Sequence, residues 1–188
     1  IGRATALLAG ARGAELFLTD VQEEALARVA EEVRAAGGRV GHAAPADLAD
    51  HAAVVALADA IHAGHGSMDV VMNVAGIATW GSIETLAHDD WRRVVDVNLM
   101  GPISVLERFV PPMIAAGRGG HVVNVSSAAG LFGLPWHAPY SASKFGLRGV
   151  SEVLRFRWGF FVQRKWAWPY ELTMRALNRW FARAVERS

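Results

Sequence analysis

Residues 121–144, HVVNVSSAAGLFGLPWHAPYSASK, contain the strongest fold signal in this chain of 188 residues. The apolar residues within 121–125 predict a short β-strand that ends at two serines. A helix is predicted over 138–156, and Tyr140 and Lys144 lie on one face of it, because residues four apart are one helical turn apart. A strand followed by a helix in this way is the repeating element of parallel α/β folds.

The same alternation extends over the whole of residues 1–156. Strands are predicted over 14–19, 39–44, 68–74 and 121–125, and helices over 22–36, 50–61, 89–113 and 138–156. Gly37 and Gly38 are suited to ending the first helix, and Asp50 to capping the second. The strand within 68–74 is mostly apolar, so we expect it to be buried on both faces. The pattern predicts an α/β fold with an open, doubly wound parallel sheet.

Polar and small residues follow the predicted strands, where such sheets bind ligands. Asp20 follows the first strand, and its carboxylate can accept hydrogen bonds from both hydroxyls of a ribose. The sequence Asn-Val-Ala-Gly at 73–76 follows another strand, and its small residues let a bound cofactor approach the backbone. These features predict a dinucleotide site at the carboxyl edge of the sheet.

Tyr140, Lys144 and Ser127 form a candidate catalytic group. An ammonium beside a phenol stabilises the phenolate, so Lys144 would allow Tyr140 to act as a general acid and base. Ser127 precedes Tyr140 by 13 residues and ends the predicted strand within 121–125. The chain has only two tyrosines, so this spacing is unlikely to arise by chance.

Together these segments resemble the classical short-chain dehydrogenase/reductase family over residues 1–156. The matching pieces are Ile1–Gly2 as the end of a glycine-rich turn, Asp20, Asp47, NVAG at 73–76, NLMG at 98–101, VNVSS at 123–127 and YSASK at 140–144. The resemblance implies a Rossmann-like fold and an NAD(P)-dependent oxidoreductase that interconverts a secondary alcohol and a ketone. It also implies a homodimer or homotetramer that pairs through the helices 89–113 and 138–156.

The resemblance assigns a role to each site residue. Ser127 would hydrogen-bond the substrate oxygen, Tyr140 would exchange a proton with it, Lys144 would bind the nicotinamide ribose, and Asn98 would hold a water. The implied cofactor contacts come from Ile1, Gly2, Asp20, Asp47, Leu48, Asn73, Ala75, Gly76, Tyr140 and Lys144. NAD is expected over NADP, because Asp20 repels a 2′-phosphate and Val21 offers it no positive charge.

The substrate is expected to be a small, apolar alcohol or ketone. Trp80, Phe132 and Trp136 follow strand ends near the expected cleft, where they either line a substrate pocket or belong to the core. Two other functions stay open: an epimerase or dehydratase of the extended branch of the family, and a cofactor-binding or scaffold protein without turnover.

The chain departs from the family pattern at both ends of residues 1–156. No strand precedes Ile1, and the last strands of the family are not represented after Phe156. Either residues are omitted at the junction of 156 and 157, or the chain carries a deletion there. Because consecutive α-carbons lie about 3.8 Å apart, an omission predicts a much larger separation between Leu154 and Phe160.

Residues 157–188 form a separate, basic and tryptophan-rich segment, with seven basic and two acidic side chains. Within it, residues 171–187 have the period of an amphipathic helix. Two hypotheses are open for this helix: it docks on its own domain or on another subunit, or it binds an anionic membrane surface.

Composition excludes several other classes of protein. The chain has no cysteine, which excludes a disulfide scaffold and a thiol nucleophile, and its histidines show no metal-binding spacing. The net charge of +1 gives no sign of nucleic-acid binding, and no apolar run approaches the roughly 18 residues of a membrane span. We therefore expect a cytoplasmic enzyme without a metal, peripheral to a membrane at most.

Overall fold

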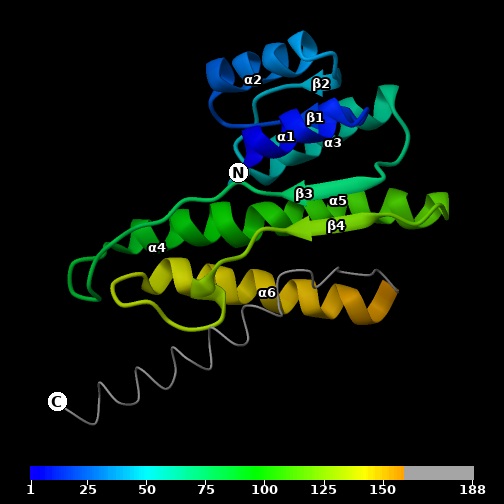
Figure 1. Ribbon diagram of the computed structural model, residues 1–188. Helices are drawn as coiled ribbons and strands as arrows, with labels where there is room; N and C mark the ends of the chain where they lie inside the picture. Colours follow the sequence, from blue (N-terminus) through cyan, green and yellow to red (C-terminus); the bar gives the residue numbers. More distant parts are fainter. Residues whose placement is uncertain (159–188) are drawn as a thin grey trace.

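The computed structural model describes the backbone of residues 1–158, in which helices alternate with short parallel strands (Figure 1). The α/β class is therefore confirmed, and the predicted elements are present within a few residues of their expected ends. In chain order they are α1 (Gly2–Ala11), β1 (Glu15–Leu18), α2 (Glu23–Ala35), β2 (Arg39–Ala43), α3 (His51–Gly64), β3 (Val70–Asn73), α4 (His88–Val95), η1 (Asp96–Met100), α5 (Gly101–Ala116), β4 (His121–Asn124), η2 (Ala128–Gly130) and α6 (Ala138–Trp158).

Local sequence signals explain several of these ends. Asp50 caps α3, because its side chain accepts a hydrogen bond from the backbone N–H of Ala52. Gly37 follows α2 with a φ of 83°, a left-handed conformation that a glycine adopts without steric cost. Helix α1 was not predicted, because its sequence begins at Gly2 without a capping side chain.

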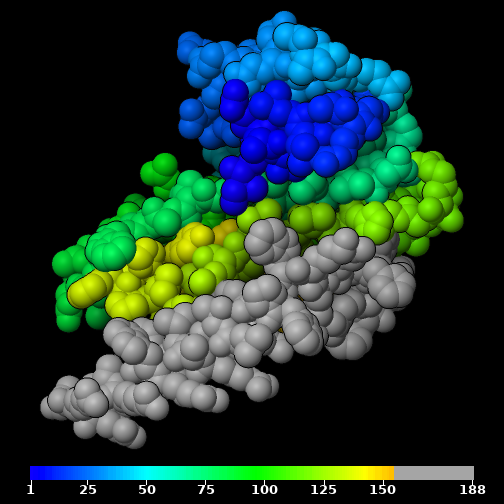
Figure 2. Space-filling model, in the orientation of Figure 1, coloured from blue at the N-terminus to red at the C-terminus, as the bar shows by residue number. Residues whose placement is uncertain are grey.

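The described strands form two separate parallel pairs, β1 with β2 and β3 with β4. Both pairs are parallel, as expected for this α/β fold, and within residues 1–158 no ladder of backbone hydrogen bonds joins β1 to β3. The first pair lies with α1 and α2, drawn in blue, and the second with α4 to α6, drawn in green to orange (Figure 1). The blue part of the chain likewise lies apart from the green and yellow part in the space-filling view (Figure 2).

Strand β3 is buried on one face only, which corrects the expectation that both faces are covered. Val71 and Asn73 are buried, whereas Val70 and Met72 are 50% and 43% exposed. Alternate side chains of a strand point to opposite faces, so the helix α5 that packs against β3 covers one of them.

The main apolar cluster lies between α3, α5 and β3, and this packing holds β3 in place. Its buried members are Ala46, Leu57, Ala58, Ile61, Val71, Phe109 and Met113. Helix α6 packs against β4 and against the turn η2. The carboxyl ends of β3 and β4 are thereby placed between α4, α5 and α6, where the candidate site lies.

The predicted helix 89–113 is interrupted before Gly101 rather than at Gly101–Pro102. Residues Asp96–Met100 form a π-helix between α4 and α5, and Pro102 lies in the first turn of α5, where proline needs no hydrogen-bond partner. Gly101 is required for close packing, since a Cβ there would lie 2.8 Å from the Cβ of Leu48.

Helix α6 is continuous from Ala138 to Trp158 and crosses the predicted boundary at residues 156–157. An α-helix advances by about 1.5 Å per residue, so the predicted separation between consecutive α-carbons is wrong for residues 154–158. Residues 159–188 lie outside the described part of the chain, and so do the predicted amphipathic helix over 171–187 and the end of the predicted break. No helix within residues 1–158 has the length and apolar character needed to cross a membrane.

Candidate active site

The first two turns of α6 carry Tyr140 and Lys144 beside the end of β4. The Lys144 side chain is 4% exposed, and its Nζ donates a hydrogen bond of 2.9 Å to the carbonyl oxygen of Val125. The same Nζ lies 5.7 Å from the centroid of the Tyr140 ring. The structure therefore brings the predicted tyrosine and lysine together, and the hydrogen bond to Val125 ties the lysine to the end of β4.

The environment of Lys144 disfavours its charged form. Burial lowers the pKa of the Lys144 ammonium from the ordinary value of 10.5. Only one of its three N–H donors is used by Val125, so two remain for a ligand. A partly desolvated cation with free donors is well suited to bind hydroxyl groups.

Asn98 is fully buried within the π-helix and joins three parts of the chain. Its Nδ2 donates to the Ile77 carbonyl at 2.8 Å and to Ser143 Oγ at 3.1 Å, and its Oδ1 accepts from the Ile77 N–H at 2.8 Å. Both amide hydrogens are thus committed to protein groups, which leaves one lone pair of Oδ1 for a water. Single-turn π-helices often occur at functional sites.

Gly76 lies against both Asn98 and Lys144. A Cβ at this position would lie 3.1 Å from Asn98 Oδ1 and 3.4 Å from Lys144 Nζ. Gly76 and the preceding Ala75 are exposed. The missing side chain keeps the approach to these two polar groups open.

Ser126 and Ser127 have different positions after β4. Ser127 caps the 3-10 turn η2, and its Oγ accepts a hydrogen bond of 3.2 Å from the Ala129 N–H, so its own hydrogen can be donated to another molecule. Ser126 Oγ instead donates to the Lys144 carbonyl at 3.2 Å. Ser126 therefore supports α6, and Ser127 is the serine that can offer a donor to a substrate.

Two of the predicted cofactor carboxylates are exposed and lie at strand ends. Asp20 follows β1, and its Oδ1 accepts a hydrogen bond of 2.9 Å from the Gln22 N–H. Asp47 Oδ1 accepts one of 2.9 Å from the Ala49 N–H. In each case the second carboxylate oxygen has no hydrogen bond among those described, so it is available to a ligand.

The other predicted cofactor residues lie at the start of α1 and the end of β3. Gly2 begins α1, and a Cβ there would lie 3.8 Å from Val74 Cγ1, so the N-terminus of α1 lies beside the Asn-Val-Ala-Gly segment. Ile1 is 84% exposed. Asn73 is different, because it is buried and its Nδ2 donates to Asn124 Oδ1 at 2.8 Å. Its amide joins β3 to β4, whereas direct cofactor contact was expected.

Sequence reasoning missed two positions that hold the site together. Ser143 Oγ donates to the Tyr140 carbonyl at 2.8 Å while it accepts from Asn98. Gly130 lets η2 approach α6, since a Cβ there would lie 2.7 Å from the Lys144 carbonyl oxygen. The position of Ser143, three residues after Tyr140 on the same helical face, was a usable signal, whereas the contact of Gly130 was not.

The burial of Lys144 predicts a pH dependence of stability. The folded chain releases the Lys144 proton at a lower pH than the unfolded chain, so between the two pKa values the unfolded state binds more protons. In that range the free energy of unfolding rises with pH. Lys144→Met should remove this contribution. The free energy of unfolding of the wild-type chain should therefore rise relative to that of the variant as the pH rises from neutrality toward 10.5.

Denaturant unfolding of both chains over a series of pH values measures this difference. Because all other titrating groups are shared, their contributions cancel in the comparison. Curves that stay parallel over the whole range would contradict the assigned effect of burial on Lys144.

The described residues contain no group of three or more histidine, aspartate or glutamate side chains that could hold a metal ion. Tyr140, Lys144 and Asn98 lie around the ends of β3 and β4, and Ser127 follows β4. A phenol beside an ammonium is suited to proton exchange with a bound oxygen.

Comparisons with known proteins identify relatives of this arrangement. A family model described as short chain dehydrogenase matches residues 1–160. The chain is 39% identical over 155 residues to the putative oxidoreductase SadH of Mycobacterium tuberculosis. This match covers 82% of the chain and 55% of that protein. It is 38% identical over 160 residues to D-threitol dehydrogenase of Mycolicibacterium smegmatis, covering 85% and 60%. The chain thus spans little more than half the length of these relatives.

Solved structures with the same fold include proteins with either nicotinamide cofactor. A metagenomic short-chain oxidoreductase in complex with NADP aligns with a TM-score of 0.76 and 39% identity, covering 82% of the chain and 71% of that structure. A short chain dehydrogenase/reductase from Burkholderia phymatum in complex with NAD aligns with a TM-score of 0.76 and 35% identity, covering 82% and 55%.

Proposed function

The chain belongs to the short-chain dehydrogenase family, and from this premise we propose that it interconverts a secondary alcohol and a ketone with a nicotinamide cofactor. The observation that carries the proposal is the convergence of Tyr140, Lys144 and Asn98 at the ends of β3 and β4. The NAD- and NADP-bound relatives support a nicotinamide cofactor.

The residues present fit such a cofactor. Gly76 leaves open the space that a Cβ would fill beside Asn98 and Lys144, and Lys144 keeps two N–H donors for ribose hydroxyls. The exposed carboxylate of Asp20 is suited to a second ribose. When bound, the nicotinamide would accept or donate the hydride.

The remaining chemistry is assigned to side chains of this chain. Tyr140 would pass its hydroxyl proton to the carbonyl oxygen during reduction and take it back during oxidation. Ser127 would donate a hydrogen bond to the same oxygen and hold it near Tyr140. Lys144, fixed by the Val125 carbonyl, would place its positive charge beside the phenol.

The activity is tested with the full chain of 188 residues, NAD or NADP and a panel of secondary alcohols and ketones. We expect a change in absorbance of the reduced cofactor that requires both cofactor and substrate. Substrate conversion with no net change in cofactor would favour an epimerase or dehydratase instead. Cofactor binding without conversion of any substrate would favour a binding or scaffold protein.

The cofactor preference is a separate proposal, and we predict NAD over NADP. The free oxygen of Asp20 would hydrogen-bond a ribose 2′-hydroxyl and repel a 2′-phosphate. The expected result is a higher kcat/KM with NAD, and Asp20→Asn should shift the ratio toward NADP. Asp69→Asn is the matched control, because it also removes one exposed carboxylate. Asp69 lies just before β3, at the end of that strand opposite to the candidate site. A higher kcat/KM of the unmodified chain with NADP would contradict the prediction.

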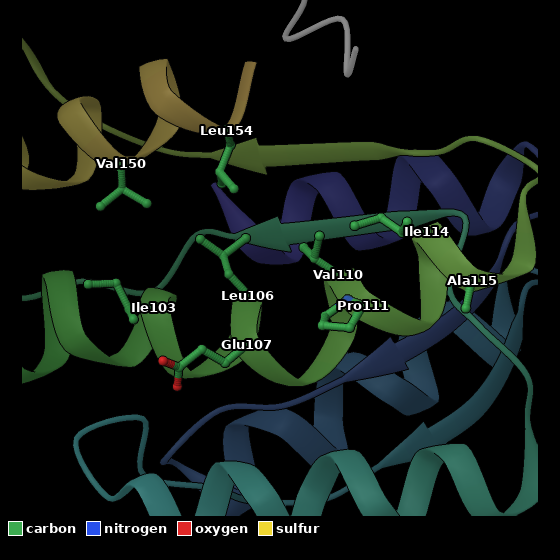
Figure 3. A pocket seen from close by; sticks show the side chains of 9 residues that line it. All are labelled: Ile103, Leu106, Glu107, Val110, Pro111, Ile114, Ala115, Val150 and Leu154. Atoms are coloured by element: carbon green, nitrogen blue, oxygen red, sulfur yellow. The ribbon is translucent and has the colours of Figure 1, made fainter. Parts of the chain in front are cut away.

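A groove between α5 and α6 supports the proposed homodimer or homotetramer. It has a volume of about 410 Å³, and Figure 3 shows Val150 and Leu154 of α6 opposite side chains of α5. Its lining is apolar except for the charged Glu107 and comprises Ile103, Leu106, Glu107, Val110, Pro111, Ile114, Ala115, Val150 and Leu154. The family pairs through these two helices, so a second copy of the chain is the expected occupant.

Light scattering at micromolar concentration measures this assembly. We expect a mass of at least twice the 20.2 kDa of one chain. Val150→Asp should lower the mass by placing a charge in the apolar groove, whereas Val21→Asp, at an exposed position in the loop before α2, should not. A mass of one chain for the unmodified protein would contradict the proposal.

A further inference from the structure

Two large, exposed aromatic side chains lie in the loops that follow β3 and β4. Trp80 follows β3 and is 67% exposed, and Trp136 follows β4 and is 58% exposed. Their rings are stacked, with centroids 5.8 Å apart and planes inclined by 26°. The sequence left open whether these tryptophans line a pocket or belong to the core, and their exposure excludes the core.

His137 connects the two tryptophans to the candidate active site. Its ring meets Trp80 edge-on, with centroids 4.3 Å apart, and lies 6.2 Å from the ring of Tyr140. The three rings therefore form a continuous aromatic surface that ends at the proposed proton donor. We call Trp80, Trp136 and His137 the aromatic platform.

Backbone hydrogen bonds hold the platform in place relative to α6. The Gly81 N–H donates to the Trp136 carbonyl at 3.0 Å, which joins the loop after β3 to the loop after β4. The Ser141 N–H donates to the His137 carbonyl at 2.8 Å in the first turn of α6. The platform is thus fixed to the same turn that carries Tyr140.

Trp136 has an uncommon backbone conformation. Its φ is 58°, and within residues 1–158 it is the only residue other than glycine with a positive φ. Such conformations are unfavourable for a bulky side chain and gather at ligand-binding and catalytic sites. The left-handed turn places the Trp136 ring on Trp80, so a function for the stacked pair explains the strain.

We propose that the aromatic platform binds the ring of the substrate and selects secondary alcohols and ketones that carry a ring next to the reacting carbon. Flat aromatic faces bind planar rings by offset stacking, and a flexible linear chain gains less from the same surface. This inference rests on the proposed function, because Tyr140 must act on the oxygen of the bound molecule.

The test compares two alcohols that share the reacting group and the number of non-hydrogen atoms, 1-phenylethanol and 2-octanol. The full chain is assayed with its cofactor, and kcat/KM is measured for each alcohol. We expect the unmodified chain to prefer 1-phenylethanol by about tenfold or more. Trp80→Ala and Trp136→Gly should reduce this preference to about threefold or less, mainly through KM for 1-phenylethanol.

Two further variants separate stacking from folding. Trp80→Phe keeps an aromatic face and should keep most of the preference. Leu8→Ala removes an exposed apolar side chain from α1, outside the platform, and should leave the preference unchanged. Circular dichroism and thermal unfolding confirm that each variant is folded. Equal preference in the unmodified chain, or an unchanged preference in both tryptophan variants, would overturn the proposal while leaving the proposed activity intact.

A binding measurement keeps the inference testable if no alcohol is oxidised. Saturation-transfer NMR would then compare acetophenone and 2-octanone in the presence of cofactor. Acetophenone should bind to the unmodified chain and lose its signal with Trp80→Ala. An absence of turnover with any substrate would contradict the proposed function, whereas an acetophenone signal that is absent from the unmodified chain or unaffected by Trp80→Ala would contradict the platform.

Discussion

Tyr140→Phe is expected to lower kcat by about 100-fold or more, because a positioned general acid and base contributes at least that factor. The substitution removes only the hydroxyl. The ring contacts of Tyr140, 5.7 Å to Lys144 Nζ and 6.2 Å to the His137 ring, are available to phenylalanine. Cofactor affinity and stability should therefore be retained, and turnover kinetics together with a cofactor-binding titration measure both.

The control for this variant removes a hydroxyl elsewhere. Ser67 lies before β3, at the opposite end of the strand from the site, and its Oγ accepts a hydrogen bond from Arg118. Ser67→Ala should leave kcat unchanged. If Tyr140→Phe keeps turnover within about threefold of the unmodified chain, Tyr140 is not the acid and base.

Gly130→Ala is expected to destabilise the fold by about 1–3 kcal/mol, the usual cost of forcing an extra carbon into packed structure. The added Cβ would lie 2.6 Å from Ser126 Oγ and 2.7 Å from the Lys144 carbonyl oxygen. One of these is backbone of α6, so η2 and α6 must separate. Because η2 carries Ser127 at its start and α6 carries Tyr140, turnover should fall as well.

Gly149 provides a matched control on the same helix. A Cβ at Gly149 would meet no atom of the described residues 1–158 within 4 Å, and the residue is exposed. Gly149→Ala should therefore stabilise α6 by up to about 1 kcal/mol, since alanine favours the helix more than glycine does. Denaturant unfolding measures both variants, and a loss of stability of the same size in each would show that the contact at Gly130 is not the cause.

Short-range patterns in the sequence were sufficient to predict most elements and part of the site. The period of the apolar residues located α2, Asp50 marked the start of α3, and α6 was predicted over 138–156. The spacing of four residues placed Tyr140 and Lys144 together, because neighbours within a helix are determined by the helix itself. These predictions depend only on residues a few positions apart.

Contacts between distant parts of the chain were decided by the tertiary structure alone. Asn98 meets the backbone of Ile77, 21 residues away, and Asn73 gives its amide to Asn124, 51 residues away. Neither partner can be read from spacing, since the first contact depends on where η1 lies relative to the loop after β3, and the second on the register of β3 with β4. For the same reason, the sequence alone did not decide whether Trp80 and Trp136 line a substrate pocket or belong to the core.

By itself, then, the sequence determined the α/β class, the family and the identity of the candidate catalytic side chains, because these follow from local periodicity and motif spacing. Only the tertiary structure decided that β1–β2 and β3–β4 form separate pairs, that one face of β3 is exposed, and that the two tryptophans stack on each other and are linked to Tyr140 through His137. The physical reason is that strand pairing, burial and ring stacking are formed between segments far apart in the chain, and their energies exist only once those segments are packed together.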